Sequence, residues 1–202
     1  MTTIASTLSG PSARPRIQRE PVISSPVLAV IFAIATEIMF FAALISALMV
    51  IRASSPNWAP PGNILLPMGA TAFNTAVLLA SGICMAVAGV PLKRRNDWKS
   101  AKRWSSAALL LGAFFVIFQG VEWSKLIAYG LTMQSGVFGG TFYLLIGSHA
   151  IHVIGALIAM VWVNRKMSKG TCSIHGFQAM QLFWTFVVLV WPVLYRLVYF
   201  GA

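Results

Sequence analysis

The chain has 202 residues, of which 58% are hydrophobic and only 9% are charged, and its mean hydropathy is +0.79. A water-soluble domain has about 25% charged residues, so this composition excludes a compact soluble fold. Fifteen Lys and Arg residues against four acidic residues leave a net charge of +11. In a soluble protein such a surplus would indicate a nucleic-acid partner, so the position of the basic residues in the chain matters.

The first 26 residues are rich in Ser, Thr and Pro, and they contain Arg14, Arg16 and Arg19. They include no apolar run long enough for the core of a signal peptide. We interpret residues 1–26 as a mobile cytoplasmic tail and residues 27–202 as one domain.

Five apolar stretches follow, each close to the ~20 residues that an α-helix needs to cross ~30 Å of hydrocarbon. A transmembrane barrel would instead show alternating strands of about ten residues. The expected fold is therefore all-α, an integral membrane bundle of five transmembrane helices. The stretches cover residues 27–51, 65–90, 105–128, 138–163 and 180–200.

The basic residues fall in segments that alternate with these helices. One side of the membrane would receive only Arg52, Lys125 and Arg196. By the positive-inside rule, the basic side is cytoplasmic, so the N-terminus lies inside and the C-terminus outside. The charge surplus then records orientation, and no nucleic-acid partner is expected. The basic side carries Arg14, Arg16, Arg19, Lys93, Arg94, Arg95, Lys99, Lys102, Arg103, Arg165, Lys166 and Lys169.

Two of the four acidic residues, Glu37 and Glu122, lie inside predicted helices, where an ionised carboxylate costs several kcal/mol. Glu37 is about eleven residues into the first stretch, so it lies ~16 Å deep. No Lys or Arg is available at that depth. We expect Glu37 to be protonated or hydrogen-bonded, either as a proton-handling or lipid-adjacent carboxyl or in a neutral interhelical hydrogen bond.

Glu122 lies near the outer end of the third stretch, one turn after Gln119, and the fourth stretch carries His149 and His152 three residues apart. A pair between Glu122 and one of these histidines would lower the cost of placing both in hydrocarbon. On this hypothesis, replacing Glu122 harms folding more than replacing Glu37 by Gln. Asn74, at mid-depth in the second stretch, joins this predicted buried polar network.

Metal or haem binding is the alternative for the two histidines. A bis-histidine haem needs ligands from facing helices, and the remaining histidine, His175, is predicted to lie in a cytoplasmic loop. No CxxC pair is present. We therefore expect no catalytic residue, metal or haem on this chain.

Motifs of soluble-substrate enzymes are missing from the sequence: it contains no P-loop, GxSxG, HExxH or dinucleotide-binding fingerprint. The basic run 93–95 has two readings, a topology signal or a contact for anionic lipid headgroups. No inverted repeat of the kind found in many transporters is visible. A small independent transporter or channel remains the less favoured alternative.

Six segments from residue 36 onward resemble subunit III of the haem–copper terminal oxidases, in its short five-helix form. They occur in the order and on the helices that the family shows. They are TEIMFFA at 36–42, NT at 74–75 with LLASG at 78–82, QGVEW at 119–123, SGVFGGTF at 135–142 and GSHAIHV at 147–153.

The last helix departs from the family pattern. Where the family reads WHFVDxVW, this chain reads WTFVVLVW at 184–191, with Thr185 in place of His and Val188 in place of Asp. Gln178 stands where a Glu is expected. A subunit III-like component of a nitric oxide reductase or another quinol-linked complex is therefore the alternative within this fold.

The resemblance implies an accessory subunit without redox centres in the plasma (inner) membrane, in a complex that reduces dioxygen to water and pumps protons in aerobic electron transport. In this family the haems and copper belong to subunit I and, where present, subunit II. Subunit III packs against subunit I and holds phospholipids between its helices. The resemblance also places Glu37 at the family's membrane-embedded carboxyl, near bound lipid and subunit I.

Overall fold

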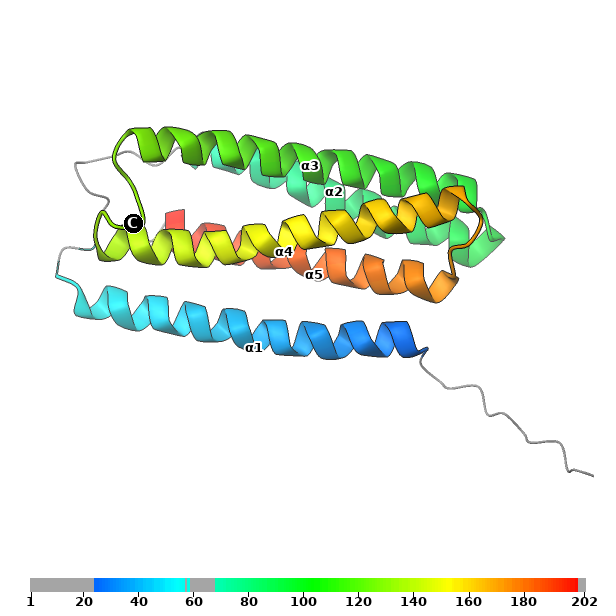
Figure 1. Cartoon of the computed structure of the whole chain (residues 1–202), viewed down its shortest axis with the longest axis horizontal. Helices are drawn as coiled ribbons and strands as arrows, with labels where there is room; N and C mark the ends of the chain where they lie inside the picture. The colour runs from blue at the N-terminus through cyan, green and yellow to red at the C-terminus, as the bar shows by residue number, and fades with distance from the viewer. Residues whose placement is uncertain (1–23, 57, 59–67, 200–202) are drawn as a thin grey trace, which may run out of the picture.

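The computed structural model describes residues 24–56, 58 and 68–199, and its described part is built from five α-helices (Figure 1). All five are long and apolar enough to span a membrane, which confirms the predicted fold class. The predicted tail lies mostly outside the described residues. The helices are α1 (Ser25–Ser54), α2 (Met68–Arg95), α3 (Trp98–Ala128), α4 (Val137–Ser168) and α5 (Ile174–Tyr199).

The connections at the basic end are much shorter than the hydropathy pattern predicts. Residues 91–104 were expected to be a break, but α2 continues to Arg95 and α3 begins at Trp98. Asp97 caps α3, because its Oδ1 accepts hydrogen bonds from the backbone N–H groups of Lys99 and Ser100. A hydrogen bond from the Ser100 hydroxyl to Oδ2, together with these backbone hydrogen bonds, holds the pKa of the Asp97 carboxyl below its usual value.

The connection between α4 and α5 shows the same difference. The predicted break at 164–176 shrinks to residues 169–173, so His175 lies in the first turn of α5 and not in a loop. Lys and Arg are good helix formers, so the helices continue through the basic segments beyond the hydrocarbon.

Helices α2, α3, α4 and α5 form a packed group, and α1 lies at its edge. Helix α2 packs along α3, and α4 and α5 lie between that pair and α1 (Figure 1). Within α1, all of which the structure describes, Phe41 and Leu48 are the only buried side chains. The core therefore sits among α2, α3, α4 and α5, and α1 is joined to it through α4 and α5.

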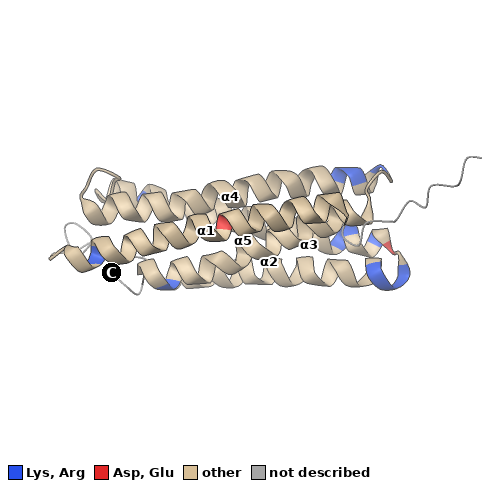
Figure 2. Cartoon of the chain, turned by 90° about the horizontal axis from the view of Figure 1, so that it is seen from below, with Lys and Arg blue, Asp and Glu red and all other residues tan. Residues whose placement is uncertain are grey.

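Basic residues gather at one end of the bundle, as Figure 2 shows. The connections between α2 and α3 and between α4 and α5 both lie at this end, and so does the start of α1. Among the described residues, Arg52, Lys125 and Arg196 are the basic residues at the other end. The charge asymmetry predicted from the sequence is thus present in the fold.

Candidate functional site

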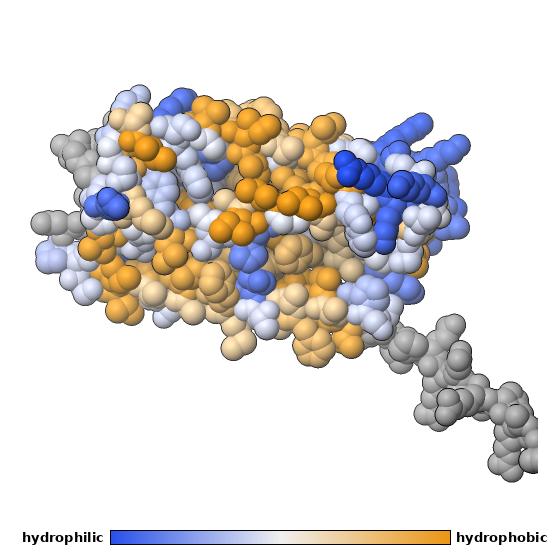
Figure 3. Space-filling model, in the orientation of Figure 1, coloured by the Kyte–Doolittle hydropathy of each residue, from blue (hydrophilic) through white to orange (hydrophobic). Residues whose placement is uncertain are grey.

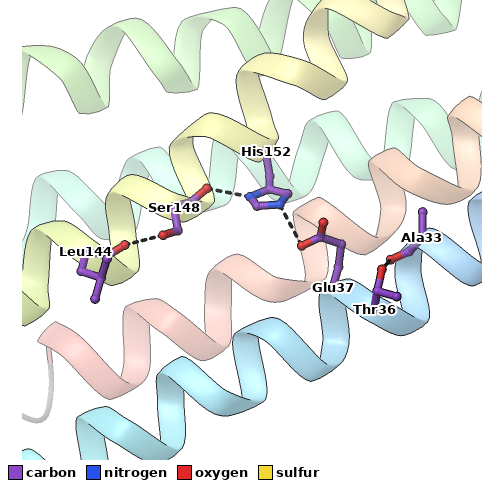
Figure 4. A network of polar contacts seen from close by, with 6 residues as sticks. All are labelled: Ala33, Thr36, Glu37, Leu144, Ser148 and His152. Atoms are coloured by element: carbon purple, nitrogen blue, oxygen red, sulfur yellow. Dashed lines mark hydrogen bonds and ion pairs between the residues drawn. The ribbon is translucent and has the colours of Figure 1, made fainter.

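Glu37 of α1 faces His152 of α4 near the middle of the bundle (Figure 4). Its Oε2 lies 2.8 Å from Nε2 of His152, and Nδ1 of the same ring lies 2.7 Å from the carbonyl oxygen of Ser148. The Ser148 hydroxyl in turn donates to the carbonyl of Leu144. Both partners of the pair are about three-quarters buried, with 27% and 20% of their side chains exposed.

The proton content of this pair follows from its geometry. A carbonyl oxygen can only accept, so Nδ1 of His152 carries a proton that it donates to Ser148. A second proton then lies between Nε2 and the Glu37 carboxyl, either on the ring as imidazolium beside a carboxylate or on the carboxylic acid. The pair is electrically neutral in both cases, which explains how a carboxyl without a Lys or Arg partner is tolerated at this depth.

Aromatic rings close the space around the pair on the α1 side. The rings of Phe40 and Phe41 lie 6.0 Å and 5.3 Å from the His152 ring, centroid to centroid. Phe41 also meets the ring of His149 edge-on at 6.3 Å. The segment 36–42 therefore supplies both the carboxyl and the rings that position it against α4.

The predicted pair between Glu122 and a histidine is wrong. Glu122 Oε1 accepts from Nζ of Lys125, one turn away on α3, at 2.8 Å. Glu122 lies six residues before the end of α3, whereas His149 lies twelve residues after the start of α4. At 1.5 Å per residue this is a difference of ~9 Å along the bundle.

His149 is buried and takes part in ring contacts. Its side chain is 1% exposed, and its ring stacks on that of Trp191 of α5 at 5.2 Å between centroids. Neither ring nitrogen has a hydrogen-bond partner among the described residues. His149 and His152 therefore have different roles in the fold, although they are only three residues apart.

Asn74 and Gln119 form a separate polar cluster between α2 and α3. The Asn74 amide donates to the carbonyl of Phe115 at 3.1 Å and to Oε1 of Gln119 at 3.2 Å. Gln119 donates to the Tyr199 hydroxyl of α5 at 3.4 Å. The candidate residues thus fall into separate groups, so a single network of Glu122, His149, His152, Gln119 and Asn74 is not observed.

Helix α5 is joined to α2 by a row of hydrogen bonds that the sequence analysis did not foresee. Each bond has its donor on α5 and its acceptor on α2, and together they run along most of the interface. They are Gln181 to the Met85 carbonyl, Trp184 to the Ser81 hydroxyl, Trp191 to the Thr75 hydroxyl and Tyr195 to the Met68 carbonyl, at 2.8–3.2 Å.

The positions that depart from the family pattern lie beside this row. Thr185 donates to the carbonyl of Gln181 within its own helix. Val188 fills the space against Gly82, where an added Cβ would approach its Cγ1 to 2.9 Å. Gln178 is half-buried and makes no side-chain hydrogen bond with the described residues. Close packing here occupies the place of a polar network.

Two apolar hollows open between neighbouring helices. One, of about 220 Å³, lies between α1 and α4, where Leu44, Leu48 and Leu144 line it. The other, of about 190 Å³, lies between α3 and α4 beside His149 and Trp191. Among the described residues, no group of three His, Cys, Asp or Glu side chains is placed to hold a metal ion.

The comparisons with known proteins agree on one family. The family model described as cytochrome c oxidase subunit III matches residues 19–202. A protein of Nocardia farcinica named probable cytochrome c oxidase subunit 3 is 37% identical over 172 residues, which cover 83% of each chain. A protein of Mycobacterium leprae with the same name is 34% identical over 170 residues, again 83% of each chain.

A chain from a further organism is similar as well. The cytochrome c oxidase subunit 3 of Oryctolagus cuniculus is 35% identical over 146 residues, which cover 70% of this chain and 54% of that protein.

Proposed function

The chain belongs to the cytochrome c oxidase subunit III family, and on that premise we propose that it packs against the catalytic subunit I of a proton-pumping respiratory oxidase. It is a multi-pass membrane protein and an accessory part of a terminal oxidase complex. In this proposal it catalyses no step itself, binds phospholipid, and supports subunit I, which holds haem and copper.

The surface of α1 is the observation that carries the packing role. Large apolar side chains cover the outer faces of this helix, and they include Phe32 at 65% exposed, Ile38 at 54% and Met39 at 73%. Glu37, in contrast, is turned inward to His152. A helix that is anchored on one side and apolar on the others suits contact with a further transmembrane helix.

Glu37 is the residue that we connect with protons and lipid. Because the pair with His152 is neutral as a whole, the carboxyl stays at mid-depth without adding a net charge there. A water-filled path that reached the pair could exchange the proton that lies between Nε2 of His152 and Oε2 of Glu37. The α1–α4 hollow is apolar and suits an acyl chain.

The sidedness follows from the charges. The end of the bundle that holds the α2–α3 and α4–α5 connections carries most of the described Lys and Arg residues. By the positive-inside rule we propose that this end faces the cytoplasm, with the N-terminus on the cytoplasmic side of the plasma (inner) membrane and the C-terminus on the opposite side.

Co-purification tests the proposal. The full chain carries an affinity tag at its C-terminus, is expressed in its own host, and is extracted in mild detergent. We expect a haem-containing oxidase subunit to co-purify, with dioxygen consumption in the eluate. We also expect the oxidase from a strain that lacks this chain to lose activity faster during turnover.

Two results would contradict the proposal. One is co-purification of a nitric oxide reductase in place of an oxidase. The other is solute uptake by the isolated chain in liposomes, which would indicate an independent transporter.

A further inference from the structure

The first turns of α3 carry three basic side chains on one face of the helix. Lys99, Lys102 and Arg103 line a shallow hollow of about 530 Å³ together with Ser106, Ala107 and Leu110. None of the three forms an ion pair with a described residue. The hollow, which we call the α3 cradle, thus presents a surplus of positive charge beside the hydroxyl of Ser106.

The nearest acidic residue offsets only part of this charge, because a single carboxylate, which interacts electrostatically with Arg103, stands against three cations. Asp97 is the one acidic residue among the described residues at this end of the bundle. Its two oxygens are occupied as the cap of α3, accepting from the backbone of Lys99 and from the backbone and hydroxyl of Ser100. The cradle therefore favours an anionic group.

The same face of α3 becomes apolar and exposed directly below the cradle. Apolar residues spaced three or four positions apart, about one helical turn, continue the same face. They are Leu110 at 70% exposed, Phe114 at 44%, Ile117 at 68% and Val121 at 50%. From Leu110 to Val121 this stripe is ~16 Å long, which is about the thickness of one hydrocarbon leaflet. Figure 3 shows hydrophilic side chains at the end of the bundle where α3 begins and hydrophobic ones along its length.

The depth of the cradle matches the headgroup level. Helix α3 has 31 residues and is ~46 Å long, close to the ~40–45 Å of a bilayer with its headgroups. The first turns then lie among the headgroups, and the long side chains of Lys102 and Arg103 can extend toward them from lower on the helix.

We propose that the α3 cradle binds the phosphate of an anionic phospholipid in the cytoplasmic leaflet, with an acyl chain lying along Leu110, Phe114 and Ile117. This proposal deepens the proposed function, because it assigns a headgroup class and a place to one bound lipid. It differs from the hollows between helices, since the site lies on the outer face of a single helix.

Lipid retention by the tagged full chain, purified with its partners, tests the proposal by native mass spectrometry with phosphatidylglycerol as the probe. The triple variant Lys99→Gln, Lys102→Gln, Arg103→Gln should weaken retention about 100-fold, at about fivefold per cation. The matched control Arg165→Gln, Lys166→Gln, Lys169→Gln removes the same charge from the end of α4 on the same side of the bundle and should change retention less than fivefold. Equal losses in both triples would overturn the proposal.

The wild-type chain supplies measurements that do not depend on how the variants fold. Phosphatidylglycerol should be retained at least tenfold better than phosphatidylcholine, and glycerophosphoglycerol, which has no acyl chains, should not displace it. Equal retention of both lipids, or displacement by the tailless phosphodiester, would contradict a lipid site. Leu110→Gln should reduce retention, whereas Ile158→Gln on the exposed face of α4 should not.

These results are separable from the test of function. Co-purification of the oxidase without selective lipid retention would overturn the cradle alone. Absence of the oxidase would overturn the function whatever the lipid result.

Discussion

Helix α5 contacts α2 on one side and α1 on the other, and the two interfaces are held by different kinds of contact. Toward α2, four side chains of α5 donate hydrogen bonds along the interface, and Trp184 and Trp191 are fully buried. Toward α1 the packing is apolar, and the inter-helix polar contact that holds α1 among the described residues is that of Glu37 with His152 of α4. The bundle therefore has an interlocked core and one loosely attached helix.

This difference has a physical origin. Lipid chains are as apolar as Leu, so helices in a bilayer associate through close packing and interhelical hydrogen bonds. Glycines on α2 and α3 let side chains of α5 approach closely: an added Cβ on Gly112 of α3 would lie 2.7 Å from Cη2 of Trp184, and one on Gly82 of α2 would lie 2.9 Å from Cγ1 of Val188. Helix α1 lacks such a contact and leaves most of its surface to its surroundings.

The largest effect is expected when Trp184 is replaced by Ala. This change opens a cavity in the core and removes the hydrogen bond to Ser81, so we expect a loss of ~3 kcal/mol in the free energy of unfolding. Unfolding in mixed micelles measures it. The control Phe32→Ala, at a side chain of α1 that is 65% exposed, should change stability by less than ~0.5 kcal/mol. Similar losses in both variants would contradict the contrast between the two regions.

A smaller loss is expected from Gly112→Ala. The new methyl group meets the Trp184 ring and Leu157, so overpacking should cost ~2 kcal/mol. On the same helix, Gly120→Ala has nothing within 4 Å of its added Cβ and should gain up to ~1 kcal/mol from helix propensity. The same unfolding assay compares the two variants. If both substitutions raise, or both lower, the free energy of unfolding, the close contact between Gly112 and Trp184 is not what limits position 112.

Substitutions that weaken the contact between α1 and α4 should cost less stability than those in the core. Glu37→Leu removes the partner of His152 and should cost ~1 kcal/mol. Glu37→Gln should cost less, because its amide can donate to Nε2 of the ring. Because Lys125, the partner of Glu122, is 58% exposed, we expect Glu122→Gln to cost less than Glu37→Leu, which is the opposite of the sequence-based expectation. A larger loss in Glu122→Gln than in Glu37→Leu would argue against this order.

The smallest effect concerns the cap of α3 and depends on pH. The pKa of Asp97 is lower in the folded chain than its ordinary value of 3.8, so its ionised form stabilises the fold above about pH 4, and this contribution is lost as the pH falls through the folded-state pKa. The difference in melting temperature between the wild type and Asp97→Ala should therefore shrink between pH 6 and pH 3. Asp97→Asn does not titrate either, so its difference from the wild type should change with pH by the same amount, but its side chain still caps the helix and keeps it more stable than Asp97→Ala at every pH. A constant difference for the Ala variant would disprove the assignment.

Much of the fold followed from hydropathy, but the helix ends did not. The five spans were predicted correctly, yet residues 98–104 and 164–168 were assigned to breaks although they are helical. A hydropathy window detects the hydrocarbon, and a helix that continues among the headgroups with Lys and Arg gives no apolar signal there. The capping carboxylate of Asp97 was the available sign for the start of α3.

The sequence pointed to polar residues at membrane depth but not to their partners. Glu37 and His152 each lie near the middle of their helices, so counting depth along both helices could have paired them in place of Glu122 and His149. The row of hydrogen bonds from α5 to α2 carried no such signal, because Trp, Tyr and Gln in an apolar helix are compatible with many faces.

The sequence by itself determined that this chain has five membrane-spanning helices with its basic residues at one end. These properties depend on whether each segment lies in hydrocarbon or in water, and not on which side chains it contacts. The tertiary structure decided which groups meet. His149 and His152 are only three residues apart, but the rotation of α4 about its axis turns His149 toward Trp191 of α5 and His152 toward Glu37 of α1. That rotation is set by the packing of whole helix faces, which no single stretch of sequence contains.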